Sequence, residues 1–302
     1  INKVIKILGD SIVYDGADRS FSPLYSDIGL VFTDYAGLTG VYYHFNRRNT
    51  AMHTHLQIDA KVENTVSDLL GVTQIFDEGN ANFSFYDHNS FIVVIEGQDT
   101  VKFNFNPKTE ISIKGLGEYK YTYTPWVEKK DDVYIFKGYM PHRDSRDPDP
   151  MFPIAIGIKV LQGDLFERGH EGLKITEEEG VIKLTRHFQM LELNNEVIIT
   201  KLEKAPATNP EARELTRQWF TKAIGDLSLN TGTEKEQRIA AKAAMALSFN
   251  ACAPTGMMKG RIATFPGRGT YATLFEWDAA FQNLAYELMD PKLAEDAILI
   301  QT

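Results

Sequence analysis

The chain has 302 residues, which is enough for one large domain or two domains of ordinary size. Its apolar fraction of 43% supports a sizeable core and excludes a chain that is disordered throughout. The net charge of -9 argues against nucleic acid as a partner, because nucleic-acid-binding surfaces are basic. No apolar run approaches the ~20 residues that a membrane-spanning helix needs, so no membrane partner is expected.

From Ile1 to about Lys204 the chain consists of short alternating segments separated by turn residues. The clearest is segment 52–62, in which apolar and polar residues fall on opposite faces. The apolar face comprises Met52, Leu56, Ile58, Ala60 and Val62, and the polar face comprises His53, His55, Gln57, Asp59 and Lys61. Such alternation predicts a strand with one buried and one solvated face, as in antiparallel sheets.

Many further strands are predicted in the same region, and Asp87–Asn89 has the composition of a turn between two of them. They cover residues 27–32, 38–45, 82–86, 90–96, 100–106, 119–124, 132–136, 152–161, 180–188 and 195–202. No helical pattern interrupts them, which disfavours a parallel α/β sheet. Residues 1–204 are therefore predicted to form an antiparallel β-sandwich domain.

The composition changes at Ala205, where a linker and a linker helix are predicted over residues 205–232. Asn209 is the expected N-cap, and Pro210 the first helical residue. Helical spacing is then kept by Leu215, Trp219, Phe220 and Ile224. Residues 233–236 have the composition of a capping box that opens an alanine-rich helix through Ala251. Further helices are expected from about residue 278 to residue 289 and from Asp290 onward.

Residues 265–288 combine a glycine-rich loop with an aromatic residue and two acids at the start of a helix. Two glycines flank Arg268 and permit backbone turns that leave it exposed. Glu276 and Asp278 place negative charge where a helix N-terminus favours it. Trp277 beside a carboxylate suits a sugar, because the ring stacks on C–H groups and the acid accepts hydroxyl hydrogen bonds. The alternative is a core Trp beside an Asp that only caps the helix.

The run Pro-Gly-Arg-Gly, a short aromatic loop and then Glu-Trp-Asp-x-x-Phe-Gln-Asn-Leu-Ala resembles the first inner-helix motif of (α/α)6-barrel glycoside hydrolases. The similarity is greatest to glycoside hydrolase family sixty-three and the related mannosylglycerate-hydrolase and trehalase-like enzymes, over roughly residues 261–302. It implies that Trp277 and Asp278 line a sugar subsite. On the same rim, the weaker substrate-binding candidates are Arg268, Tyr271, Phe275 and Gln282.

The resemblance also implies a fold and an activity. An N-terminal β-sandwich is followed by the first helices of an (α/α)6 barrel, over residues 233–302. The expected reaction is inverting hydrolysis of an α-linked sugar, with a general acid Asp and a general base Glu beyond Thr302. The chain ends inside an apolar helical pattern without a stop signal, so we expect it to be part of something longer. Its expected partners are a carbohydrate substrate and the remaining barrel segment, on the same or a separate chain.

Functions other than hydrolysis remain open. Besides the enzyme portion described above, the chain could be a non-catalytic carbohydrate-binding or structural β-domain with a helical appendage. A phosphorylase or lyase on the same barrel is a third possibility, which phosphate dependence would reveal. The single Cys252 cannot form an internal disulfide, which is compatible with the cytoplasmic location that we expect.

No cofactor or metal is expected. The sequence lacks a P-loop and a dinucleotide-binding glycine motif after a strand. His53 and His55 resemble half of a cupin metal site, but the only later candidate ligand, His142, lacks the required glycine spacing, so no metal is predicted. Tyr121, Tyr123 and Trp126 are predicted to be core residues rather than a sugar platform, since aromatic residues at alternating strand positions usually pack inward.

Overall fold

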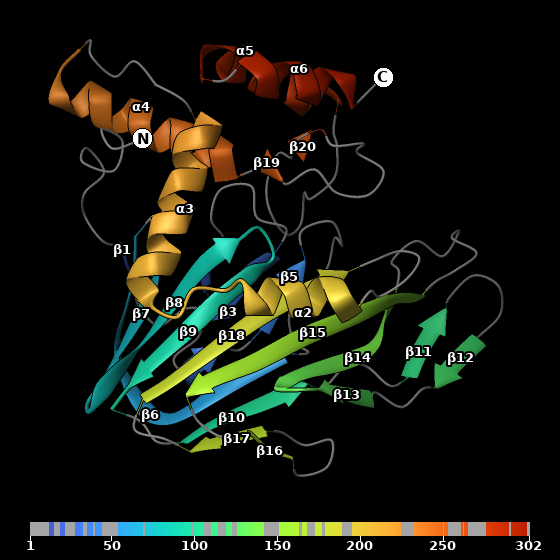
Figure 1. The fold of residues 1–302 in the computed structure, drawn as a ribbon. Coiled ribbons are helices and arrows are strands. Elements are labelled where there is room, and N and C mark those ends of the chain that lie inside the picture. The colour runs from blue at the N-terminus through green and yellow to red at the C-terminus, as the bar shows by residue number, and fades with distance from the viewer. Residues whose placement is uncertain are drawn as a thin grey trace.

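The structure is a computed structural model, and its described part consists of antiparallel sheets followed by helices (Figure 1). It describes residues 12–14, 19–21, 28–32, 35–38, 40–43, 54–68, 70–97, 100–105, 110–113, 119–122, 126–141, 151–162, 165–167, 173–176, 179–188, 195–224, 232–249, 251–252, 261, 263–264, 276–289 and 291–300. The predicted order of a β-sandwich and then helices is confirmed.

Most described strands belong to one hydrogen-bonded sheet that runs β13-β14-β15-β18-β9-β8-β7-β6-β10-β17-β16, with β1 and β4 also paired to β6. These strands are β1 (Ile12–Tyr14), β4 (Tyr35–Leu38), β6 (Thr54–Ser67), β7 (Gly71–Phe76), β8 (Gly79–Asp87), β9 (Ser90–Glu96), β10 (Thr100–Phe105), β13 (Trp126–Lys130), β14 (Val133–Pro141), β15 (Met151–Gln162), β16 (Leu165–Glu167), β17 (Leu173–Thr176) and β18 (Glu179–Phe188). Smaller sheets comprise β2 (Arg19–Phe21), β3 (Ile28–Phe32) and β5 (Gly40–Tyr43); β11 (Glu110–Ile113) and β12 (Tyr119–Thr122); and β19 (Ala251–Cys252) and β20 (Ala263–Thr264).

Strand β6 joins the two layers of the sandwich because its two halves have different partners. Its first half pairs with β10 and β4, and its second half pairs with β7 and β1. A bulge after Val62 reverses the alternation, so that Leu56 and Ile58 are buried before it and Thr65 and Ser67 after it. The predicted two-faced strand is confirmed over residues 56–62, and the structure extends it to residue 67.

A buried amide ties the edge strand β4 to β7. Gln74 Oε1 accepts a hydrogen bond from the backbone N–H of Gly37 (2.7 Å), and Gln74 Nε2 donates to the carbonyl of Tyr35 (3.2 Å). Gly37 has a φ of 105°, and a Cβ at this position would lie 1.8 Å from the carbonyl oxygen of Leu56. Both the conformation and the close approach therefore require glycine.

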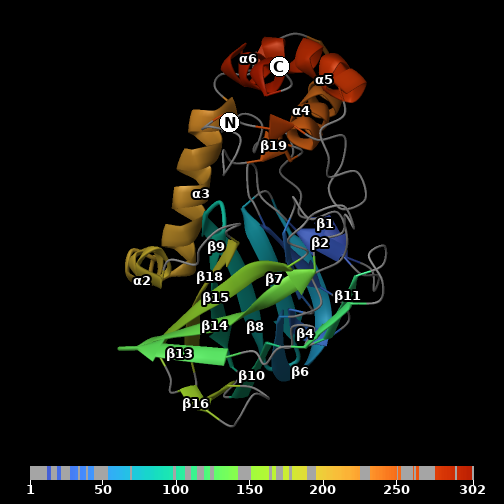
Figure 2. The same cartoon turned by 90° about the vertical axis from the view of Figure 1, so that its right-hand side faces the viewer.

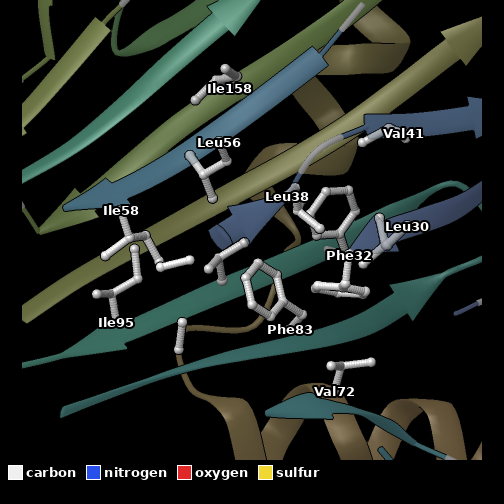
Figure 3. Close-up of a cluster of buried hydrophobic side chains, with 14 of the residues drawn as sticks. Leu30, Phe32, Leu38, Val41, Leu56, Ile58, Val72, Phe83, Ile95 and Ile158 are labelled. Carbon is white, nitrogen blue, oxygen red and sulfur yellow. The ribbon is translucent and has the colours of Figure 1, made fainter. Parts of the chain in front are cut away.

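Apolar side chains from both layers meet in one continuous core (Figure 3). Phe32 and Phe83 contact each other edge to face at its centre, with ring centroids 5.0 Å apart. The core residues labelled in the figure are Leu30, Phe32, Leu38, Val41, Leu56, Ile58, Val72, Phe83, Ile95 and Ile158. Since these residues come from strands far apart in sequence, the core depends on the complete sandwich.

Two helices cover the outer face of the larger layer. Helix α2 (Asn195–Glu203) packs on β14, β15 and β18, and helix α3 (Asn209–Ile224) packs on β8 and β9 (Figure 2). Under α2, a second cluster joins Ile135, Ala155, Ile198 and Leu202. Parts of β9, β14 and β15 are consequently buried on both faces, and their sequences are nearly continuous apolar runs.

The strand predicted at 195–202 is wrong, because this segment is helix α2. Its run of β-branched residues favoured a strand, but Ile198 and Leu202 are spaced by one helical turn and are both fully buried. The predicted strand 38–45 is likewise divided between β4 and β5. Tertiary burial, rather than local propensity, decides the conformation of residues 195–203.

The start of α3 differs by one residue from the prediction. Thr208 is the N-cap, since its carbonyl accepts the N–H of Ala212 (3.1 Å) and Glu211 Oε2 accepts the N–H of Thr208 (3.2 Å). Asn209 instead accepts a hydrogen bond from Ser84 on β8, which fastens the helix to the sheet. On the same helix, Leu215 is exposed rather than buried.

The remaining helices are α4 (Glu234–Phe249), α5 (Glu276–Met289) and α6 (Pro291–Leu299). The capping box before α4 is confirmed by the bonds between Thr233 and Glu236, but the helix ends at Phe249, and Ala251 lies in β19. Figures 1 and 2 place these helices together beyond one end of the sandwich, with α3 running toward them. None of the described helices is long and apolar enough to cross a membrane.

We expect Gln74→Leu to lower the free energy of unfolding by about 1–3 kcal/mol, because it leaves the buried N–H of Gly37 without an acceptor. Denaturant unfolding and the Tm measure the loss. Ile75→Leu, a control on the exposed side of the same strand, should change stability by less than ~0.5 kcal/mol. Wild-type stability in Gln74→Leu would contradict the role of the amide.

Candidate functional site

Helix α5 carries the motif that the sequence singled out, and it has two unlike faces. Ala279 and Tyr286 are buried, and the Tyr286 hydroxyl donates to the carbonyl of Leu247 on α4 (2.7 Å). On the opposite side, Phe281 and Leu284 are 69% and 67% exposed. The buried face packs within the helical group, and the other presents large apolar side chains to the surroundings.

Asp278 and Gln282 lie between these two faces. Asp278 is in the first turn of α5 and is half-buried, and Gln282 follows one turn later and is also half-buried. Residues spaced by four positions are neighbours on a helix surface, so the two polar groups border the face of Phe281 and Leu284. A carboxylate and an amide beside apolar side chains can hold a ligand that has both hydroxyls and C–H surfaces.

The structure brings together only part of the predicted site. Arg268, Tyr271 and Phe275 lie outside the described residues. Trp277 is the second residue of α5. The grouping of Trp277, Asp278 and Gln282 on one helix therefore stands, and the contribution of the loop stays a prediction.

Within the described part of the chain, no group of three or more His, Cys, Asp or Glu side chains could hold a metal ion. His53 and His142 lie outside the described residues, and His55 is placed in β6 opposite Asn104. The prediction that the histidine pair binds no metal therefore remains a prediction.

A charged cluster at the β8–β9 turn was missed in the sequence. Asp87 lies 2.5 Å from both Lys201 Nζ of α2 and Nδ1 of His88, and Lys201 Nζ also donates to Asn89 Oδ1 (2.6 Å). Burial alone would raise the pKa of Asp87, but its hydrogen bonds and charge interactions with His88 and Lys201 hold the pKa well below its ordinary value. The turn composition was visible in the sequence, whereas nothing indicated that Lys201 would reach it.

A second missed feature is the buried acid Asp296 in α6. Its side chain is almost inaccessible and lies 2.5 Å from Lys292 Nζ, one helical turn earlier. The hydrogen bond to Asp296 raises the pKa of Lys292. The Lys-x-x-x-Asp spacing was available in the sequence, and it indicates a helix surface pair rather than a catalytic group.

Trp126 is not a core residue, so that prediction is wrong. It lies on β13, the edge strand of the large sheet, and is 36% exposed. An edge strand has a neighbour on one side only, which leaves the ring less covered than aromatic residues of inner strands. Tyr121 lies in β12, and Tyr123 lies outside the described residues.

The fold has a counterpart among solved structures. The chain is similar to a structure described as "Putative kojibiose phosphorylase from human microbiome", with a TM-score of 0.54 and 12% sequence identity. The match covers 98% of this chain and 47% of that chain, so the chain spans about half the length of the matched protein. At this identity the similarity shows the fold alone, and it does not identify family sixty-three.

No protein-family model and no curated protein matches the chain. The structural match nevertheless runs through the sandwich and the helices together, because it covers nearly the whole chain. A sandwich followed by helices is therefore an arrangement that this chain shares with a longer protein.

We expect the ion pair of Asp87 and Lys201 to make stability depend on pH. Because the pKa of Asp87 is lowered in the folded state, its contribution is present above the ordinary carboxyl pKa of about 3.9 and is lost as the pH falls below it. Asp87→Asn should therefore be less stable than wild type at pH 7, and the difference should shrink toward pH 3. Denaturant unfolding across this range measures it.

Asp77→Asn, at the exposed β7–β8 turn, is the matched control for this series. A stability difference between wild type and Asp87→Asn that stayed constant with pH would show that the carboxylate charge is not the cause.

Proposed function

We propose that the chain is the N-terminal part of an enzyme that acts on the glycosidic bond of an α-linked sugar. The observation that carries the proposal is the Glu276-Trp277-Asp278 run, which opens helix α5 in a chain whose sandwich and helices share the fold of a longer protein. Residues 1–204 form the sandwich domain of this proposal, residues 205–232 the linker and its helix, and residues 233–302 the start of an (α/α)6 barrel.

In this proposal Trp277 and Asp278 bind substrate. The indole ring would stack on the C–H face of a sugar, and Asp278 would accept its hydroxyl hydrogen bonds at the positive end of α5. Gln282, one turn away on α5, would bind a neighbouring hydroxyl. Arg268, Tyr271 and Phe275 would complete the rim from the preceding loop.

The reacting groups of the proposed enzyme belong to the rest of the barrel. An inverting hydrolase needs a general acid and a general base ~6.5–9.5 Å apart, with a water between the base and the sugar. Glu276 and Asp278 are separated by one residue on a single helix, which does not place a substrate between them. The general acid and the general base are therefore expected in the remaining barrel segment, on the same or a separate chain.

The exposed apolar residues of the helices support a further layer of helices. Ile239 of α4, Phe281 and Leu284 of α5, and Ile298 of α6 are all more than half exposed. Large apolar side chains that recur on several helices are usually covered by a partner surface. A barrel segment packed on them is the occupant that the fold similarity favours.

Phosphorolysis is the second candidate, and the name of the matched structure is the observation that favours it. In that reaction inorganic phosphate replaces water as the nucleophile at the same anomeric carbon, so the substrate subsite needs the same features. A non-catalytic carbohydrate-binding or structural β-domain is the alternative from another class.

The reaction class can be tested with α-linked disaccharides of glucose and mannose, with and without inorganic phosphate. We expect the protein with its complete barrel to release sugar, and the 302-residue chain alone to release none. Sugar phosphate that forms only with phosphate identifies a phosphorylase, and free sugar in its absence identifies a hydrolase. Absence of both products from the complete protein on every disaccharide would contradict an enzyme.

The substrate role of Asp278 can be tested in the complete enzyme. We expect Asp278→Ala to lower kcat/KM by about one to two orders of magnitude, because a hydrogen bond to a charged group is worth roughly 1.5–3 kcal/mol. Asp278→Asn, which removes the charge but keeps the size of the side chain, should also lose activity while keeping a Tm close to that of the wild type. Wild-type kinetics in Asp278→Asn would show that the carboxylate does not bind substrate.

A further inference from the structure

The exposed ring of Trp126 lies on the same sheet face as α2 and α3. Trp126 pairs with Lys137 and Glu128 with Ile135, and Ile135 packs against α2, so both β13 residues are on the α2 side. The register from β15 through β18 and β9 to β8 places Ser84, which binds α3, on this face too. A ligand on Trp126 would therefore lie on the helical side of the sandwich.

The indole ring is held in a fixed orientation. Its Nε1 donates a hydrogen bond to Glu128 Oε1 (3.1 Å), and the same oxygen accepts one from Lys137 Nζ (2.8 Å). The other carboxylate oxygen accepts a hydrogen bond from Asn195 Nδ2 at the start of α2 (2.5 Å). A ring positioned before binding loses little conformational freedom when a ligand stacks on it.

The surroundings of the ring favour a neutral, hydroxyl-rich ligand. Glu128 is partly exposed, and its carboxylate accepts hydrogen bonds from Trp126, Lys137 and Asn195. Lys129, Lys130, Asp131 and Asp132 next to it are exposed. A protein partner that covered this surface would have to desolvate these charges. A sugar can instead stack on the indole ring and form hydrogen bonds to the charged side chains through its hydroxyls.

We propose that Trp126, with Glu128 beside it, is a second carbohydrate-binding site on the β-sandwich, which holds an α-linked oligosaccharide by stacking. The site is separate from helix α5 and carries out no chemistry. The choice of an α-linked ligand rests on the proposed function, but the ring, its orientation and its polar border do not. Such a site would raise the local concentration of a long substrate on the helical side of the sandwich.

Isothermal titration of the 302-residue chain with maltoheptaose tests the site. We expect saturable binding at millimolar ligand, and Trp126→Ala should weaken it by about tenfold or more. Trp126→Phe, which keeps a flat ring, should retain part of the affinity. Tyr35→Ala is the matched control, since Tyr35 is an aromatic residue on β4 that is 71% exposed, and it should leave binding unchanged.

Trp277→Ala separates this site from the one on α5. In the Trp277→Ala background, which removes the indole of the α5 site, we expect maltoheptaose still to bind, and adding Trp126→Ala should weaken this binding by about tenfold or more. This result does not depend on whether the complete enzyme is active on disaccharides. Circular dichroism and the Tm confirm that each variant is folded. Absence of maltoheptaose binding, or binding in the Trp277→Ala background that survives Trp126→Ala, would overturn the proposal.

Discussion

The shared strand β6 is the constraint on which the rest of the structure depends. One strand pairs in both layers of the sandwich only because its bulge reverses which residues point inward. Without the reversal, Thr65 and Ser67 would turn outward, and Asn64 and Val66 would turn inward in their place. Gln74 and Gly37 hold the edge strand β4 against this corner, where backbone groups would otherwise be buried without partners.

Once the core is closed by β6, the outer face of the larger layer can accept helices. Apolar packing supplies most of the stability here, through Ile198 and Leu202 against β14 and β15. Polar contacts define where each helix lies: Lys201 with Asp87 and Asn195 with Glu128 for α2, and Thr216 with the carbonyl of Phe85 for α3. Through α3 they also direct the chain toward α4, α5 and α6.

The aromatic residues divide into two groups with different tasks. Phe32, Phe83 and Phe91 are buried in the sandwich and stabilise it. Trp126 on the sheet edge is instead partly exposed and lies beside the carboxylate of Glu128. We propose the same class of ligand for Trp126 and for the site on α5, and the register of the sheet puts Trp126 on the helical side of the sandwich.

The sequence by itself determined the order of a β-sandwich and then helices, most strand positions and the capping box at Thr233. These features follow from alternation and from neighbouring residues, which are local properties. It also singled out the start of α5, where Trp277, Asp278 and Gln282 share one helix, although the loop before it rests on the resemblance alone.

Only the tertiary structure decided what depends on distant partners. Residues 195–203 contain a β-branched run, yet they form a helix because Ile198 and Leu202 fill the space over β14 and β15. Trp126 is an aromatic residue at an alternating strand position, a pattern typical of core residues, yet it is partly exposed because β13 is the last strand of its sheet. Lys201 meets Asp87 across more than a hundred residues of chain. No local pattern encodes such pairings, because burial and edge position belong to the assembled sheet and not to any one segment.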